Sequence, residues 1–353
     1  MKFLVRNLLL LSIIVLLLLG GSFFYFLKVP PAPSSGKIVF EVKRGESFSS
    51  VLNRLEKRKL IHKASLMKLF YMPFGRYVRV GEYELSYDMS PLEILRVLQS
   101  GKSKEQSITF KEGINIYEMA EKLEKRGIVS KEDFLSLCKD RKFIYELLGE
   151  NLPSLEGYLF PETYKITKYT NIKTLIRQMV HNFLKTYNGL LKDKPQTQLS
   201  RHEVVILASI VEKETGAPEE RPLIASVFLN RLKKGMRLQT DPTILYGILD
   251  QTGVMKKNIT KKDILTPTRY NTYTFKGLPY GPISNPGREA LRAVLFPAKT
   301  NYLFFVSKNN GTHVFSADLK SHNRAVRKYQ LNKKMRQGHS WRDLSKRKKA
   351  KSF

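Results

Sequence analysis

A long uncharged stretch near the amino terminus constrains this chain more than any other feature. From Asn7 to Leu27 there are 21 residues without a formal charge, most of them Leu, Ile and Val. As a helix rising 1.5 Å per residue, the stretch is about 30 Å long, the thickness of a bilayer's hydrocarbon core. It predicts a transmembrane anchor over 7–27, with residues 1–6 cytoplasmic and nearly all of the protein's mass on the other side.

A cleavable signal peptide is the alternative, because Gly20-Gly21-Ser22 offers small residues. The apolar run continues to Leu27 without an A-x-A pattern, so we favour a retained, single-pass anchor. Basic residues precede and follow the stretch, so the charge comparison does not decide its orientation, although long domains translocate largely regardless of charge. Residues 28–36 are rich in Pro and Ser and predict a semi-rigid linker.

An internal repeat follows at an offset of 68 residues. Val42-Lys-Arg-Gly45 aligns with Phe110-Lys-Glu-Gly113, and Leu55-Glu-Lys-Arg58 aligns with Leu123-Glu-Lys-Arg126. Each copy is predicted to form a strand, a glycine turn and two amphipathic helices. In the first copy another strand follows, and Ser90-Pro91 then predicts the capped start of a helix.

This β-α-α-β order resembles a LysM-type glycan-binding module over 37–106, with a second repeat-like module over 107–150. Two small packing units without a ligand are the alternative. The second half predicts further helices, a constrained loop over 277–287 and a hairpin around Asn309-Asn310-Gly311. The predicted fold class is therefore α+β: a transmembrane helix, a LysM-like module and a mixed α/β catalytic domain over 151–330.

The net charge is +31, with 62 Lys and Arg against 31 Asp and Glu, which raises the question of a nucleic-acid partner. The last 27 residues contribute +10 of it, eleven basic residues minus one acidic. Residues 331–353 are therefore predicted to form a basic tail, either solvated and disordered or attracted to anionic lipids and wall polymers. The chain carries no nucleic-acid recognition motif, so we expect no such partner.

Several kinds of chemistry have no support in the sequence. No phosphate-binding loop, dinucleotide fingerprint, zinc-protease motif or nucleophile elbow is present, and the six histidines lack metal-ligand spacing. We therefore expect neither a metal nor a cofactor. The single cysteine, Cys138, excludes an intrachain disulfide and is predicted to be a core thiol.

One carboxyl stands out on a predicted helix over 203–215. Leu207, Ile210, Val211 and Glu214 recur at helical spacing on one face, whereas Glu212 should face more solvent. Desolvation at the end of an apolar face would raise the pKa of Glu214 and keep it protonated, as a general acid requires. Periodicity alone also allows Glu214 to pair with a cation or to emerge at the helix end.

Other carboxylates have simpler interpretations from spacing. Asp241 precedes a proline and is predicted to be an N-cap, and Glu162 lies in Phe160-Pro-Glu-Thr-Tyr164, where it can bond the backbone of a turn.

Seven segments in fixed order carry a family resemblance. They are Leu155-Glu-Gly-Tyr-Leu-Phe-Pro-Glu-Thr-Tyr164, Ala208-Ser-Ile-Val-Glu-Lys-Glu-Thr215, Ala225-Ser-Val-Phe-Leu-Asn-Arg-Leu232, Met236-Arg-Leu-Gln-Thr-Asp-Pro-Thr243, Tyr270-Asn-Thr-Tyr273, Gly277-Leu-Pro279 and Pro297-Ala-Lys-Thr300. Together they resemble the endolytic murein transglycosylases, bacterial membrane-anchored enzymes of the plasma membrane that cut nascent peptidoglycan on its extracytoplasmic side.

The resemblance implies a lyase that cuts between N-acetylmuramic acid and N-acetylglucosamine, leaves 1,6-anhydro ends and can terminate strand elongation. It implies that Glu214 is the single catalytic acid, and it suggests sugar contacts at Gln239, Asp241, Asn271, Tyr273 and Glu162. The sugar-contact residues have loop scaffolding as their alternative role. Implied partners are glycan strands, the membrane and wall-synthesis enzymes. A non-catalytic, membrane-anchored peptidoglycan-binding protein that recruits those enzymes is the alternative function.

Overall fold

The computed structural model describes residues 2–71, 77–195, 197–214 and 217–332. The chain divides into two compact units. The first comprises Met1–Ile108 with Tyr164–Thr170, and the second comprises Thr109–Thr163 with Asn171–Phe353. In the described part the strands form three two-stranded sheets among many helices, which confirms the predicted mixture of helix and strand.

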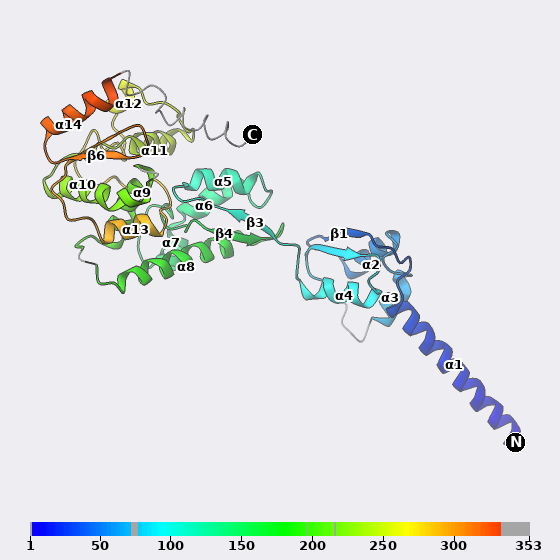
Figure 1. The fold of residues 1–353 in the computed structure, drawn as a ribbon. Helices are drawn as coiled ribbons and strands as arrows, with labels where there is room; N and C mark the ends of the chain where they lie inside the picture. The colour runs from blue at the N-terminus through cyan, green and yellow to red at the C-terminus, as the bar shows by residue number, and fades with distance from the viewer. Residues whose placement is uncertain (1, 72–76, 196, 215–216, 333–353) are drawn as a thin grey trace. The chain divides into compact units, whose positions relative to one another are not determined.

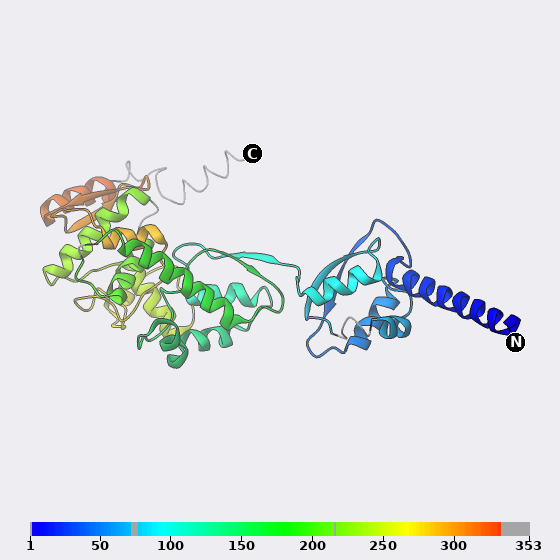
Figure 2. The same cartoon turned by 90° about the horizontal axis from the view of Figure 1, so that it is seen from below.

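Helix α1 (Lys2–Lys28) contains the predicted anchor (Figure 1). Its segment Arg6–Lys28 is long and apolar enough to cross a membrane by length and composition, and most of its side chains are exposed. The last turn is different, because Leu27 is buried in the core of the first unit. Both views show α1 ending beside α3 (Ala64–Phe70) (Figure 2). Residues 28–36 therefore connect two parts of one unit.

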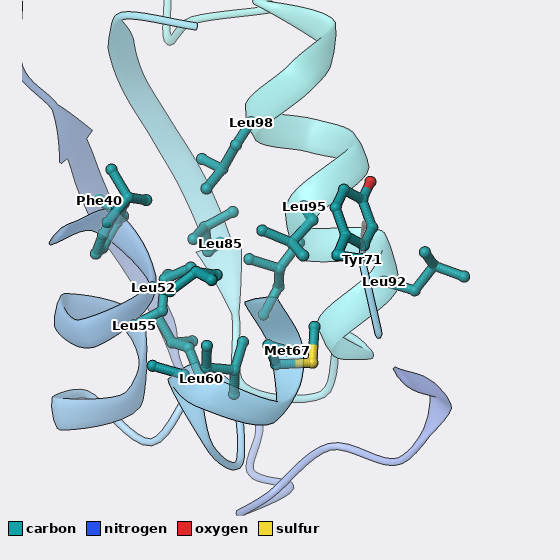
Figure 3. Packing of buried hydrophobic residues seen from close by; sticks show 14 of the residues in the cluster. Phe40, Leu52, Leu55, Leu60, Met67, Tyr71, Leu85, Leu92, Leu95 and Leu98 are labelled. Atoms are coloured by element: carbon teal, nitrogen blue, oxygen red, sulfur yellow. The ribbon is translucent and has the colours of Figure 1, made fainter. Parts of the chain in front are cut away.

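The first unit has the predicted β-α-α-β order. Strand β1 (Lys37–Val42) pairs antiparallel with β2 (Gly81–Ser86), from Lys37 opposite Ser86 to Val42 opposite Gly81. Between them lie α2 (Phe48–Lys57) and α3, and α4 (Pro91–Ser100) follows. Apolar side chains from all five elements meet in one core (Figure 3). The order matches the prediction, but many small modules share it, and it does not by itself assign a ligand.

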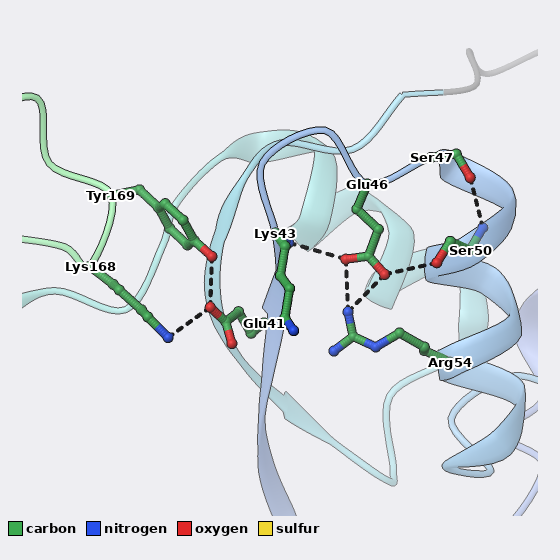
Figure 4. A network of polar contacts seen from close by, with 8 residues as sticks. All are labelled: Glu41, Lys43, Glu46, Ser47, Ser50, Arg54, Lys168 and Tyr169. Atoms are coloured by element: carbon green, nitrogen blue, oxygen red, sulfur yellow. Dashed lines mark hydrogen bonds and ion pairs between the residues drawn. The ribbon is translucent and has the colours of Figure 1, made fainter.

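The segment 164–170 returns to the first unit through a polar network on β1 (Figure 4). Glu41 accepts a hydrogen bond of 2.6 Å from the Tyr169 hydroxyl and lies 2.8 Å from the Lys168 ammonium. Glu46 forms a bidentate pair with Arg54 nearby. The domain boundaries predicted from the sequence placed residues 164–170 with the catalytic domain over 151–330, whereas the structure groups them with the first unit.

The predicted repeat is present in the backbone. Helices α5 (Ile116–Glu124) and α6 (Lys131–Lys139) correspond to α2 and α3. The correspondence extends to the turns, where Gly45 and Gly113 have φ angles of 74° and 77°. Ser47 and Asn115 occupy equivalent positions as the N-caps of α2 and α5. Lys59 and Gly127 follow the two helices with positive φ angles. Equivalent backbone hydrogen bonds close the two helix ends, from Leu60 N to Leu55 O and from Ile128 N to Leu123 O.

The second copy belongs to the second unit, although its strands cross the boundary. Strand β3 (Gln106–Thr109) pairs with β4 (Thr163–Ile166), and an additional helix, α7 (Arg141–Leu148), follows α6.

The rest of the second unit is largely helical around a central helix, α9 (Arg201–Glu214), which packs against α10, α11 and α13 (Figure 1). The predicted hairpin is confirmed as β5 (Phe304–Ser307) and β6 (His313–Ser316). After this hairpin, the last described helix ends at Val326 and continues in a turn of π-helix over Arg327–Leu331, and most of the basic tail lies outside the described residues. The remaining helices are α8 (Ile172–Leu191), α10 (Arg221–Lys233), α11 (Asp241–Thr252), α12 (Lys261–Leu265), α13 (Arg288–Leu295) and α14 (Leu319–Val326).

Candidate active site

Glu214 is the last residue of α9, a helix enclosed by protein on all sides. Every side chain from Val204 to Val211 is buried, because α10, α11 and α13 surround the helix. The single apolar stripe predicted for this helix is therefore wrong. Glu212 does not face solvent: its side chain is 5% exposed, it pairs with Arg221 at 2.9 Å, and it accepts a hydrogen bond from Gly287 N.

The carboxyl of Glu214 is held by one hydroxyl, on a residue that is half-buried as a whole. Thr240 Oγ donates a hydrogen bond to Glu214 Oε1. Burial raises the pKa of Glu214 to about 7; Asp241 also raises it, whereas the Thr240 hydroxyl and the Arg231 cation oppose the rise. A carboxyl with this pKa is half protonated near neutrality and can both donate and accept a proton.

Thr240 belongs to a cluster of three buried threonines that bond one another. Thr240, Thr243 and Thr272 are each at most 2% exposed. Thr243 Oγ donates to Thr240 O at 2.6 Å and lies 2.9 Å from Thr272 Oγ, and Thr240 N donates to Thr272 Oγ. The sequence analysis did not identify Thr240 as a functional residue. Its position between Gln239 and Asp241-Pro242, within a family motif, was the feature that could have indicated it.

Asp241 and Tyr273 form a polar pair beside this carboxyl. The Tyr273 hydroxyl donates to Asp241 Oδ1 at 2.7 Å, and burial raises the pKa of Tyr273 above its ordinary value. The predicted N-cap role of Asp241 is wrong, because Thr240 is the N-cap and Asp241 is the first residue of α11. Asp241 is exposed, so its second oxygen faces solvent.

Gln239 precedes the hydroxyl donor in a rare backbone conformation. Its φ is 48°, in the left-handed region that residues other than glycine seldom adopt, and its side chain is exposed. Backbone strain of this kind is concentrated at functional sites.

Arg231 supplies a buried positive charge to the same region. It is 8% exposed, donates to Leu303 O at 2.7 Å and Leu238 O at 2.6 Å, and lies over the Phe304 ring. These bonds join α10 to β5 and to the segment that leads to Thr240.

Two predicted sugar contacts have structural roles here. Asn271 is fully buried, its amide donates to the carbonyl oxygens of Asp263, Ile264 and Thr266, and its oxygen accepts from Tyr273 N. This supports the scaffolding alternative, because no polar atom is left for a sugar. Glu162 accepts a hydrogen bond of 2.8 Å from Asn182 on α8, and it is not one of the described residues that bond Glu214, Asp241 or Tyr273.

A second buried carboxyl, Glu156, ties the surrounding elements together. It accepts hydrogen bonds from Ile116 N at 3.0 Å, Tyr246 Oη at 2.8 Å and Asn285 Nδ2 at 3.1 Å. Burial raises its pKa to about 8, although the hydrogen bonds favour the charged form. Sequence reasoning did not single out Glu156; its signal was an acid alone in the apolar run Leu155–Leu159.

The constrained loop over 277–287 lies against α9 and is mostly buried. Ile283 N donates to the buried Ser209 Oγ at 3.0 Å, so Ser209 joins this loop to α9. Gly157 is required where this loop passes, because a Cβ there would lie 2.5 Å from Val205 and 2.7 Å from Pro282. Cys138 is fully buried, as predicted. Among the described residues, no group of three or more His, Cys, Asp or Glu is placed to hold a metal ion.

Comparison with known proteins agrees with this architecture. Two endolytic murein transglycosylases are similar: that of Bacillus subtilis is 33% identical over 84% of this chain and 86% of its own length, and that of Streptococcus pneumoniae is 31% identical over 84% of this chain and 59% of its own. A crystal structure of a YceG-like protein from Listeria monocytogenes has a TM-score of 0.54 at 33% identity, over 82% of this chain and 99% of the other. Residues 40–328 match the YceG-like family, to which this chain belongs.

Proposed function

We propose that this chain is a membrane-anchored lytic transglycosylase that cuts peptidoglycan strands internally, with Glu214 as its single catalytic acid. One observation carries the proposal: the carboxyl of a half-buried glutamate, bonded by Thr240 and with a pKa raised to about 7, lies in a family motif. The relatives named endolytic murein transglycosylases support the substrate class.

The proposed reaction needs only one protein carboxyl. Protonated Glu214 donates its proton to the glycosidic oxygen between N-acetylmuramic acid and N-acetylglucosamine, and the bond from C1 to that oxygen breaks. The muramic C6 hydroxyl attacks C1, and the Glu214 carboxylate takes the hydroxyl proton. A 1,6-anhydro end forms without water, and the substrate's own hydroxyl replaces the second carboxylate of a hydrolase.

The neighbours of Glu214 have matching roles in this proposal. Thr240 occupies Oε1 and stabilises the carboxylate form, so Oε2 is the oxygen that exchanges protons with the substrate. Gln239 and the Asp241–Tyr273 pair, which are accessible beside it, would contact the sugars.

The proposed setting follows from α1. We propose that α1 stays in the bacterial plasma membrane as a single-pass anchor, with the catalytic unit outside the cytoplasm, where nascent strands and wall-synthesis enzymes are found. The exposed apolar segment Arg6–Lys28 supports this setting.

Mass analysis of digestion products tests the proposal. We expect the full chain to release fragments whose muramic ends are one water lighter than hydrolysed ends, and Glu214→Gln to lower turnover at least a thousandfold with its fold retained. Glu212→Gln is the matched control on the same helix, for which a smaller loss is expected. Hydrolysed ends would replace the lyase mechanism with a hydrolase mechanism, and an active Glu214→Gln protein would remove the assignment. Glycan binding without turnover in the wild type would favour the non-catalytic recruiting role.

A further inference from the structure

A small hollow lies in the second unit, apart from the residues that contact Glu214. Its volume is about 140 Å³, and its walls include the rings of Tyr246, Tyr270 and Tyr280. Since about 10–15 Å³ by this measure holds one water, the hollow has room for a carboxylate-bearing group.

Positive charge exceeds negative charge around this hollow. Lys139, Arg141 and Arg269 line it together with one acid, Asp250. Asp250 is paired with Arg269 at 3.4 Å, and Arg269 also lies over the Tyr280 ring at 4.3 Å. Lys139 Nζ lies 3.2 Å from the Tyr117 hydroxyl, and among the described residues Arg141 forms no ion pair. Two cations are therefore left to attract an anion.

The hollow is connected to the candidate active site by one segment of chain. Residues 269–273 run along α11 in the opposite direction, with Thr272 beside Thr243 and Tyr270 beside Gly247. At one end Tyr273 bonds Asp241, and at the other Arg269 bonds Asp250. These two aspartates are nine residues apart on α11 (Asp241–Thr252), which corresponds to roughly 13 Å along the helix axis.

We propose that this hollow is a subsite for a carboxylate of the peptide stem that the glycan strand carries. The inference rests on the proposed function, because it requires a peptidoglycan substrate at Glu214. Lys139 and Arg141 bind the carboxylate at the rim, and the tyrosine rings contact the stem's aliphatic portions.

Reach and chemistry both favour a stem over other anions. An extended peptide spans about 3.3–3.6 Å per residue, so a stem of four or five residues covers the separation between Asp241 and the hollow. Arg and Lys side chains bind carboxylates through charge-assisted hydrogen bonds. A singly charged group also suits a rim where Asp250 already lies nearby, whereas a doubly charged phosphate would be repelled more strongly.

The test compares three preparations of glycan strands of one length distribution: stems intact, stems removed by an amidase, and stem carboxylates converted chemically to amides. For the full chain we expect KM to be about tenfold lower for intact stems than for either of the others. In the double variant Lys139→Gln/Arg141→Gln we expect this difference to disappear, so that KM is about the same for all three preparations. The matched control Lys192→Gln/Lys320→Gln removes two exposed positive charges elsewhere in the unit and should keep the preference.

The outcomes separate the two proposals. A wild-type protein that cleaves none of the three preparations contradicts the proposed function. A wild type that cleaves all three with equal KM overturns the stem subsite alone. A preference that survives in Lys139→Gln/Arg141→Gln, or that the control loses equally, also overturns it.

Discussion

The two units treat polar groups in opposite ways. Among the described residues, Ser90 is the one polar side chain buried in the first unit, and it is a helix cap. The second unit buries a much larger polar set: Asn115, Glu156, Ser209, Glu220, Arg221, Ser226, Arg231, Thr240, Thr243, Asn271, Thr272, Ser284, Asn285 and Ser316.

The glutamates show the same contrast. In the first unit, the pKa is lowered for Glu41, Glu46, Glu56, Glu84 and Glu93, because hydrogen bonds from cations, hydroxyls and backbone amides outweigh burial. In the second unit, burial raises the pKa of Glu112, Glu156 and Glu214, whereas hydrogen bonds lower the pKa of the two aspartates Asp263 and Asp318.

The repeat shows that this contrast arises from context. In the first copy, the turn at Gly45 and the cap Ser47 are exposed. In the second, Gly113 N donates to Asn285 O, Lys213 on α9 donates to Gly113 O, and the first amide of α5 donates to Glu156. The glycine turn and helix cap of the repeat are therefore exposed in the first unit. In the second unit the same turn bonds residues of α9 and of the loop beside it, close to the end of α9 where Glu214 lies.

The largest expected effect concerns Glu156. Its pKa of about 8 exceeds the ordinary value, so between pH 4.5 and 8 the folded state keeps a proton that the unfolded state has lost. The second unit should therefore lose stability on the order of a few kcal/mol as pH rises through this window. In Glu156→Gln this part of the decline should be absent, as measured by hydrogen exchange of α5 and α9 amides between pH 5 and 8.

Glu93→Gln in the first unit is the control of opposite sign. The pKa of Glu93 is lowered, so its stabilisation is present above pH 4.5 and is lost as pH falls. Equal pH responses in the two variants would contradict the contrast between the units.

Thr240→Val tests whether the polar interior tunes the catalytic acid. The hydroxyl bonds Glu214 and favours its charged form, so its removal should raise the pKa of Glu214. Since a hydrogen bond to a charged group is worth about 1.5 kcal/mol, the alkaline limb of kcat/KM should move up by about one pH unit. Thr243→Val removes an equally buried hydroxyl that does not contact Glu214; the interpretation fails if both variants move the limb equally.

The sequence predicted local structure well where one segment contains the cause. The long amino-terminal helix, the repeat, the Ser90 cap and the hairpin each depend on neighbouring residues, and each is confirmed as local structure, whereas the anchoring role of the helix stays a prediction. The same reasoning failed for Glu212, because three helices surround α9 and helical periodicity detects one buried face only.

The candidate site was only partly predictable for a related reason. Helical spacing drew attention to Glu214 and the family motif implied its role, but its hydroxyl partner is 26 residues away, and Glu156 is bound by three segments distant in sequence. Such convergence depends on tertiary packing. A family motif names the segments involved without showing that Asn271 faces inward while Asp241 faces solvent.

The paired helix caps provide a smaller test of the two contexts. Asn115 is 2% exposed and accepts from Glu118 N, whereas Ser47 is exposed and accepts from Ser50 N. Asn115→Ala should cost about 2 kcal/mol, because it leaves the partly buried donor Glu118 N unsatisfied, and Ser47→Ala should cost about 0.5–1 kcal/mol, because water replaces the cap. Hydrogen exchange of α5 and α2 amides measures both, and equal costs would contradict a difference in context.

The smallest expected effect isolates the backbone from its context. Lys59 and Gly127 end equivalent helices at φ angles of 57° and 65°, and a Cβ at Gly127 would meet no atom within 4 Å. Backbone conformation alone then predicts that Lys59→Gly stabilises the first unit and Gly127→Ala destabilises the second, each by about 1 kcal/mol. Thermal unfolding followed by hydrogen exchange in each unit measures both changes. The Lys59 side chain lines a hollow with Tyr25 and His62. If Lys59→Gly instead destabilises the first unit, the contacts of this side chain stabilise the unit by more than the strained backbone costs. The turn in the first unit would then depend on its surroundings, as the turn in the second unit does.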